Sequence, residues 1–314
     1  MSISSQIVRM GKSVASSVAT SAERFVRLFP YITASINQAG AATKLSQLLL
    51  LDRYLDIRRG VAAPKSFRDV EFRAYSQNGE DGILLYIFGI IGFETRRSVE
   101  ICAGDGIECN SANLIVNHGW DALLFDGDPL RIKRGQSFYG KGYVSGSSRD
   151  TFTWPPKLIN AWITAENVND LIRDNGFTGK IDLLSIDVDG MDYWIWSAIE
   201  VVQPRVVVVE CNILWGSERS VTVPYNPQFR TQYGPYGSDY SGASLAAMVK
   251  LGRAKGYRFV GCEKYGFNAF FVREELAGEL LPEANLADCL NHPFAKFAAQ
   301  SRLPNAIGRE WVEI

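Results

Sequence analysis

Strand-like and helix-like segments alternate along the chain from about residue 65 onward, and this alternation restricts the fold more than any other feature. The apolar segments 98–102, 180–190 and 205–212 are typical of buried strands, whereas 164–176 and 244–256 have helical patterns. Strands that alternate with helices pair in parallel, with helices on both faces of the sheet. The sequence therefore predicts an α/β fold built on a mostly parallel sheet.

The last two predicted strands, 257–262 and 268–273, depart from this pattern. Only the segment 263–267 separates them, and it is too short to hold a crossover helix. We therefore expect these two strands to run antiparallel to each other.

An N-terminal helical extension is expected to precede this domain. Leucines recur there at every third or fourth position, which is helical spacing: Leu45, Leu48, Leu51 and Leu55. The segment 61–67 contains Pro64 and interrupts the pattern. We expect a helical extension at 1–64, the α/β domain at 65–280 and a tail at 281–314 that packs on the domain.

Composition excludes several classes of partner. The net charge is −1 and no basic stripe is present, so we expect no nucleic-acid partner. The longest apolar run, Gly82–Phe93, is shorter than a membrane span and predicts a buried helix instead. The five cysteines form no CxxC pair and are odd in number, which favours free thiols and a cytoplasmic location.

The segment VEICAGDGIECNSANLI, residues 99–115, predicts a strand, a turn of small residues and a helix. Gly104 and Gly106 would let the backbone pass close to a ligand at the carboxyl end of the strand. Asp126 follows twenty residues after Gly106, at the end of the next predicted strand. A carboxylate there can accept hydrogen bonds from two ribose hydroxyls. The sequence therefore predicts a nucleoside-binding site.

The identity of the nucleoside follows from what the motif lacks. The dinucleotide fingerprint G-x-G-x-x-G fails because Cys109 occupies its third glycine position. Glu100 lies within the strand, where it would repel a pyrophosphate. A carboxylate suits a ligand with cationic groups better, and S-adenosylmethionine (SAM) carries a sulfonium, an ammonium and a ribose.

Four motifs resemble the SAM-dependent methyltransferase superfamily, and most closely its FkbM-like and related branch: YSQNGEDGIL, VEICAGDGIECNSANLI, LLSIDVDGMDYWIW and VVVVECN. The resemblance spans about residues 67–273. It implies a Rossmann-like sheet of seven strands, mostly parallel with an antiparallel last strand, and SAM as the cofactor.

The resemblance also implies roles for individual residues. The first SAM motif would comprise Glu100, Ala103, Gly104, Asp105 and Gly106. Asp126 would bind the ribose, and Asp187 would lie near the methionine end of SAM and the acceptor. This chain has Cys102 where such motifs carry their first glycine.

The segment SQNGEDG, residues 76–82, allows two interpretations. In the first, Ser76 or Asn78 caps the apolar helix, with Glu80 and Asp81 favoured in its first turn by the helix dipole. Alternatively, Gln77 and Glu80 face the cofactor.

Acidic residues also lie toward the ends of the predicted strands 180–190 and 205–212. Asp187 is our first candidate for a general base and Asp189 the second, because an acceptor hydroxyl must lose a proton. No metal ion is expected, although Asp187, Asp189 and Asp192 could bind Mg²⁺ together with Glu210. The long polar and aromatic loop 215–242 is a candidate lid that contacts the substrate.

These features together predict a SAM-dependent methyltransferase, with a small-molecule or glycan acceptor methylated on oxygen. The sugar or glycan acceptor is implied by the resemblance alone. Two alternatives remain: a non-catalytic binding or scaffold protein with this fold, and a Mg²⁺-dependent transferase that uses the acidic strand ends.

Overall fold

The computed structural model describes residues 40–144, 154–234 and 237–314. The chain divides into two compact units, residues 1–47 and residues 48–314. The helical expectation for residues 1–39 lies outside the described residues, and the proposed boundaries at residues 64 and 280 stay predictions. In the described part of the chain, no helix has the length and hydrophobicity that a membrane span needs.

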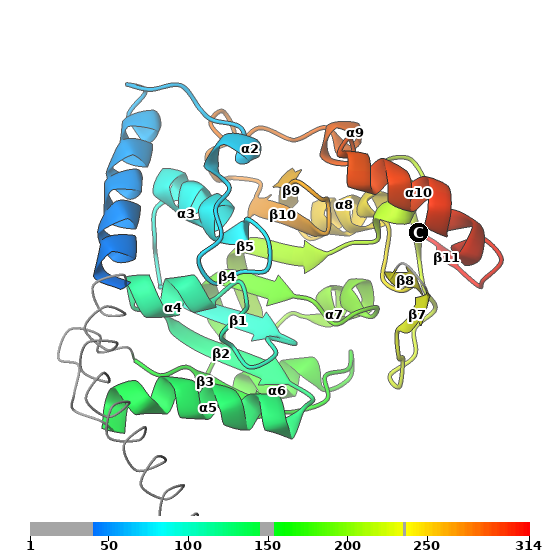
Figure 1. The fold of residues 1–314 in the computed structure, drawn as a ribbon, viewed down its shortest axis with the longest axis horizontal. Coiled ribbons are helices and arrows are strands. Elements are labelled where there is room, and N and C mark those ends of the chain that lie inside the picture. The colour runs from blue at the N-terminus through cyan, green and yellow to red at the C-terminus, as the bar shows by residue number, and fades with distance from the viewer. Residues whose placement is uncertain (1–39, 145–153, 235–236) are drawn as a thin grey trace, which may run out of the picture. The chain divides into compact units, whose positions relative to one another are not determined.

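The second unit is built on a seven-stranded sheet in the order β3-β2-β1-β4-β5-β10-β9 (Figure 1). The strands β3, β2, β1, β4 and β5 are parallel, whereas β10 is antiparallel to both of its neighbours. This confirms the predicted α/β fold, including the antiparallel last strand. The strands are β1 Arg97–Ile101, β2 Asp121–Asp126, β3 Lys157–Asn160, β4 Gly179–Ile186, β5 Val202–Glu210, β9 Tyr257–Cys262 and β10 Asn268–Arg273.

Helices cover both faces of the sheet because its strands are apolar on both sides. Val207 and Val209 of β5 pack with α6, α7 and α8, whereas Val206 and Val208 pack with α3 and with the helix that ends at residue 58. The helices of the domain are α2 Phe67–Val70, α3 Glu80–Ile91, α4 Ala112–His118, α5 Pro129–Val144, α6 Val168–Asp174, α7 Asp192–Ala198 and α8 Leu245–Ala254.

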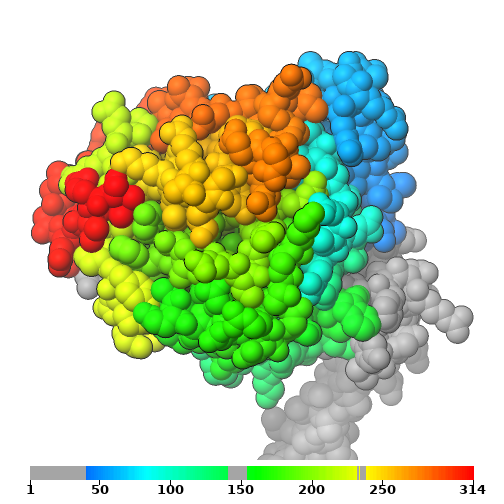
Figure 2. All heavy atoms as spheres, turned by 180° about the vertical axis from the view of Figure 1, so that it is seen from behind, coloured from blue at the N-terminus to red at the C-terminus, as the bar shows by residue number. Residues whose placement is uncertain are grey.

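Smaller elements follow the main sheet. On the side seen in Figure 2, the orange segment after β10 lies beside the gold α8, where Arg253 and Glu283 form an ion pair of 2.6 Å. The smaller elements are η1 Ile213–Trp215, β6 Val221–Thr222, β7 Gln232–Gly234, β8 Gly237–Tyr240, α9 Leu286–Cys289, α10 Pro293–Ala306 and β11 Val312–Glu313. The predicted loop 215–242 therefore contains short strands, two of which pair with each other and one with β11.

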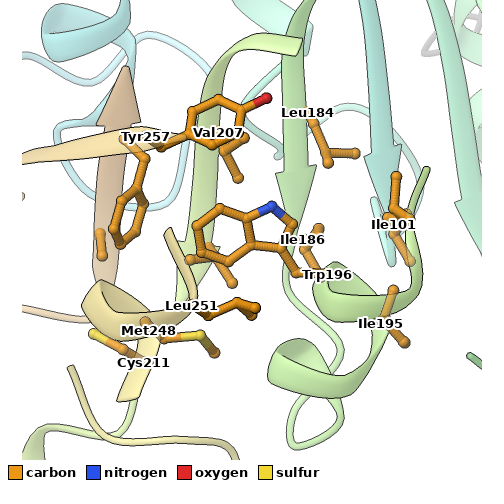
Figure 3. Close-up of a cluster of buried hydrophobic side chains, with 14 of the residues drawn as sticks. Ile101, Leu184, Ile186, Ile195, Trp196, Val207, Cys211, Met248, Leu251 and Tyr257 are labelled. Carbon is orange, nitrogen blue, oxygen red and sulfur yellow. The ribbon is translucent and has the colours of Figure 1, made fainter. Parts of the chain in front are cut away.

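Trp196 of α7 lies in the core between the sheet and α8 (Figure 3). Its ring packs against Phe271 with the ring centres 4.9 Å apart, and Ile186 and Val207 lie near it in Figure 3. The indole of Trp194 instead donates a hydrogen bond to the carbonyl of Val223. Both tryptophans therefore hold α7 in place.

The buried face of the N-terminal helix differs from the predicted one. The helix spans residues 40–58, and Leu48 of the predicted stripe is largely exposed. Tyr54 and Ile57 are buried instead, and a Cβ on Gly89 of α3 would come within 2.7 Å of Tyr54. Leu51 of the predicted stripe does pack against the core. Four consecutive leucines at 48–51 fit more than one helical phase, so the spacing of leucines alone placed only part of the buried face.

Candidate functional site

A cavity of about 420 Å³ opens at the carboxyl ends of the parallel strands. Its walls come from the turn after β1 at Cys102, the end of β2 at Asp126, the segment after β3 at Trp162, the segment after β4 at Asp189, and the loop at Phe229. Open parallel sheets bind ligands at this edge. The cavity therefore lies where the sequence places the nucleoside.

The turn after β1 has left-handed backbone at three positions, with φ of +65° at Cys102, +62° at Gly104 and +71° at Gly106. Glycine adopts this conformation without strain. At Gly106 a side chain is also excluded by space, because a Cβ would lie 2.8 Å from Leu124. The turn thus needs its glycines for shape, while Cys102 adopts a conformation that L side chains avoid.

Asp126 is the buried carboxylate of the cavity wall, with 4% of its surface exposed. Its Oδ2 accepts a hydrogen bond from the N–H of Gly104 at 2.9 Å, and its Oδ1 accepts one from the N–H of Asp128 at 2.8 Å. The guanidinium of Arg131 lies 4.0 Å from Oδ2. Because a carboxylate offers about four acceptor sites, Oδ1 keeps capacity for a ligand hydroxyl, and a hydroxyl on Oδ2 would replace its weak contact with the thiol of Cys102 at 3.8 Å.

The thiol of Cys102 faces the cavity, with its Sγ 3.8 Å from Oδ2 of Asp126. Its surface is open to the cavity, although protein atoms surround most of the side chain. Burial, and then the negative charge of Asp126, raise the pKa of this thiol well above its usual range. Cys102 is therefore a neutral thiol on the cavity wall.

Glu100 is not among the residues that line the cavity, and its expected contact with the cofactor stays a prediction. Its Oε1 and Oε2 accept hydrogen bonds from the N–H groups of Asn110 at 2.9 Å and Ser111 at 2.7 Å, just before α4. Burial raises the pKa of this carboxyl. Glu100 pairs with Leu124 and Ser185 in the neighbouring strands, on the face of the sheet that α4 covers. It fastens the loop to the sheet.

The other residues of the first motif shape the turn and are not among the residues that line the cavity. The N–H of Ala103 bonds to the carbonyl of Phe125, which extends the β1–β2 pairing. Asp105 accepts a hydrogen bond from the N–H of Ile107 at 3.0 Å and lies 3.3 Å from Arg134. Their expected contact with the cofactor stays a prediction.

Gln77 and Glu80 do not line the cavity either. Gln77 is exposed, whereas Glu80 is fully buried and accepts hydrogen bonds from Asn78 and, at 2.9 Å, from the side chain of Asn268. The hydroxyl of Ser76 accepts the N–H of Asp81 in the first turn of α3. The motif does begin a helix, but Gly79 is its N-cap instead of Ser76 or Asn78, and the expected contact of Gln77 and Glu80 with the cofactor stays a prediction.

Three carboxylates cluster beyond the ends of β4 and β5. Asp187, Asp192 and Glu210 each offer an oxygen, and these oxygens lie within 4.8 Å of one another. Both oxygens of Asp192 accept backbone N–H groups, from Val188 at 2.8 Å and Gly190 at 3.0 Å. Burial raises the pKa values of all three, and their mutual repulsion adds to this for Asp187 and Glu210. The cluster favours a shared proton or a bound cation.

Asp189 is separate from this cluster and lines the cavity. Its backbone φ is +54°, and its Oδ1 lies 3.5 Å from the hydroxyl of Tyr233. The structure thus places the two candidate bases differently. Asp187 belongs to the acidic cluster, whereas Asp189 faces the cavity.

Sequence reasoning did not identify Trp162 and Arg230, which join the two sides of the cavity. The guanidinium of Arg230 stacks over the Trp162 ring at 3.9 Å, and the indole N–H donates to the carbonyl of Pro227 at 2.8 Å. Nearby, the hydroxyl of Tyr225 donates to Glu166. The loop flagged as a lid is therefore fastened to the segment after β3.

No family model matches the chain, and no curated protein matches it. Solved structures similar to it include the N-terminal domain of EvdMO1 with SAH bound, at 11% identity and a TM-score of 0.41, over 66% of this chain and 83% of that one. A putative RNA methyltransferase, PH1948 from Pyrococcus horikoshii, has 11% identity and a TM-score of 0.34, over 70% of this chain and 96% of that one. A SAM-dependent methyltransferase from Clostridium acetobutylicum has 11% identity and a TM-score of 0.32, over 57% and 83%. Similarities this distant carry no argument about function, which must come from the geometry.

Proposed function

We propose that this protein is a SAM-dependent methyltransferase that acts on a hydroxyl of a small-molecule or glycan acceptor. The observation that carries the proposal is the buried Asp126 carboxylate, braced by two backbone N–H groups on the wall of the cavity. Its remaining acceptor sites suit the two hydroxyls of a ribose. The resemblance of the motifs to the SAM-dependent methyltransferase superfamily supports the same cofactor.

The residues present fit SAM. The cavity falls within the usual range of roughly 300–1,000 Å³ for small-molecule sites. A Cβ on Gly104 would have no neighbour closer than 3.9 Å, so open space lies beside this glycine. Trp162 and Phe229 offer aromatic surface, and Asp126 and Asp189 offer negative charge for a cationic ligand. When bound, SAM would supply an electrophilic methyl group on its sulfonium.

For the acceptor, Asp187 remains the first candidate for a general base and Asp189 the second. Burial and the neighbouring carboxylates raise the pKa of Asp187, which brings a carboxylate closer to the range in which a base works at neutral pH. Asp189 is nearer to the open cavity. Holding the acceptor in line with the methyl group would supply much of the acceleration.

Calorimetric titration with SAM and with S-adenosylhomocysteine (SAH) tests the proposal. We expect micromolar binding to the native chain and a loss of roughly 10- to 100-fold in Asp126→Ala, because hydrogen bonds to a charged group contribute about 1.5–3 kcal/mol. Asp121→Ala is the matched control, since Asp121 begins the same strand in a surface pair with Arg97. If the native chain binds neither compound, the alternative of a non-catalytic binding or scaffold protein takes its place.

The acidic cluster supports a second candidate function, a Mg²⁺-dependent transferase. Three carboxylate oxygens within 4.8 Å can bind one hard cation. Titration with Mg²⁺ should then give saturable heat that Glu210→Gln removes, and EDTA should abolish transfer until Mg²⁺ is restored. Absence of Mg²⁺ binding, with SAM binding intact, leaves the metal-independent enzyme.

We further propose a cytoplasmic location and a place near the FkbM-like branch. All five cysteines are free, which suits a reducing compartment.

A further inference from the structure

A second cavity, of about 450 Å³, lies beside β9, which is the edge strand of the sheet opposite β3. It is enclosed by α2, the end of β9, the segment 280–285 and α9 (Figure 1). None of the residues that line it lines the cavity of Asp126. Whatever binds here would therefore not compete directly for that site.

The floor of this second cavity is aromatic and built to shape. The ring of Phe67 packs edge-on against Tyr86 and Phe270, with ring centres 6.4 Å and 5.6 Å apart. A Cβ on Gly261 would come within 2.8 Å of the Phe67 ring, so β9 accommodates this ring by carrying a glycine. The buried phenol of Tyr86 accepts the N–H of Lys65 at 2.8 Å and supports Phe67 from below, so the half-buried Phe67 ring supplies the aromatic surface. A flat apolar group would find a preformed surface here.

The rim of the second cavity is cationic. Lys65, Arg68 and Lys264 line it and are exposed, and none of them forms an ion pair with another described residue. The guanidinium of Arg68 reaches only the carbonyl of Asp288, at 3.5 Å.

The acids at this cavity offset only part of that charge. Glu283 is paired with Arg253 at 2.6 Å. Glu263 is buried and directs both oxygens to backbone N–H groups, those of Tyr265 and Phe267. Among the described residues, Asp288 on the lining and Glu71, whose carboxylate lies beside Lys264 and Arg68, remain to face the three cations at the rim. An anionic group placed there would meet net positive charge over an aromatic floor.

We propose that this second cavity binds an aromatic anion, a planar ring that carries a phosphate, sulfonate or carboxylate. The ring lies over Phe67, and the anionic group lies among Lys65, Arg68 and Lys264. Both halves of the ligand are needed, because exposed cations alone bind anions weakly and a groove of this polarity holds an uncharged ring poorly. The proposal is independent of the methyltransferase activity.

The test uses 1-anilinonaphthalene-8-sulfonate, a sulfonate on a planar naphthalene ring whose fluorescence rises in apolar surroundings. Titration of the full chain should show one saturable site, unaffected by excess SAH. The charge-reversing variants Arg68→Glu and Lys264→Glu should each weaken binding at least tenfold. Both side chains are exposed, so circular dichroism should show that each variant stays folded. Lys133→Glu is the matched control, because Lys133 is an exposed cation on α5 that lines neither cavity.

Three results would overturn the proposal. The first is an absence of saturable binding, or binding to several sites of equal affinity. The second is an equal loss of affinity in Lys133→Glu, which would indicate general attraction to a cationic surface. The third is displacement of the dye by SAH, which would place it in the cavity of Asp126. None of these results depends on whether the protein transfers methyl groups.

Discussion

Replacing Cys102 by glycine should stabilise the protein, because this residue holds a left-handed conformation with φ of +65°. Such a conformation costs a residue with a Cβ roughly 1–2 kcal/mol. Glycine removes that strain, but it raises the entropy of the unfolded chain at a cost of about 0.5–1 kcal/mol. The thiol is open to the cavity, so its removal sacrifices little packing. The net gain in unfolding free energy should be about 0.5–1 kcal/mol, or roughly 1–3 °C in the melting temperature.

Urea denaturation and calorimetric melting of three proteins measure this effect. Comparing the native chain with Cys102→Gly and Cys102→Ala separates the effect of backbone strain from the effect of losing the thiol. Alanine deletes the thiol but keeps the Cβ, whereas glycine removes both. We expect Cys102→Gly to be the most stable and Cys102→Ala to match the native chain or fall slightly below it. The glycine variant should also bind SAH at least as tightly, since it restores the residue that such motifs carry.

The reasoning fails if Cys102→Gly is less stable than Cys102→Ala. That order would mean that the turn after β1 carries no strain at this position. A loss of stability in both variants relative to the native chain would instead mean that the thiol contributes through its contact with Asp126.

Other perturbations follow from buried groups and from the cavity. Asp182→Ala should lower the unfolding free energy by about 3–5 kcal/mol in urea titrations, because the buried carboxylate pairs with Arg205 at 2.9 Å and accepts three backbone N–H groups of residues 94–96, which its loss leaves without this partner. A loss below about 1 kcal/mol would contradict this. Burial raises the pKa of Glu263 from 4.5 to about 7, so its stabilising effect is complete below pH 4.5 and is lost as the pH rises through 7. Between pH 4.5 and 7, the unfolding free energy of Glu263→Gln should therefore fall by about 3 kcal/mol less than that of the native chain. Parallel curves of unfolding free energy against pH for the two proteins would refute the assignment. Trp162→Ala should weaken SAH binding about tenfold by calorimetry, whereas Trp154→Ala, an exposed tryptophan outside the cavity, should not; equal effects would remove Trp162 from the site.

The sequence alone predicted those helices, strands and turns that follow from the residue types and spacing within one short segment. The valines of β5 and the turn between β1 and α4 follow from residue type and spacing, and the two closely spaced final strands had to be antiparallel. The strand β3 and the helix α5 went unpredicted. β3 is short, and α5 contains glycines that disfavour a helix. Gly135 is nevertheless required, because a Cβ there would lie 2.1 Å from the carbonyl oxygen of Asp105. Tertiary packing, which sequence patterns do not show, selects that residue.

The same distinction applies to the candidate site, where some residues could be placed from the sequence and others could not. Asp126 could be placed on the cavity wall from its distance to the glycine turn and its position at the end of a strand. Trp162 could not, because it follows the unpredicted β3. The motif predicts that Glu100 contacts the cofactor, which stays a prediction, but it did not reveal that the carboxylate accepts hydrogen bonds from the loop before α4. Which face a strand residue occupies depends on the neighbouring elements, and a single sequence does not reveal those.

A crystal structure of the chain with SAH tests the central claim most directly. We predict the ribose hydroxyls on the two oxygens of Asp126 and the adenine beside Trp162, with the turn after β1 unchanged. Binding of SAH away from Asp126, or a structure at saturating SAH in which this cavity holds none, would contradict the proposed cofactor site.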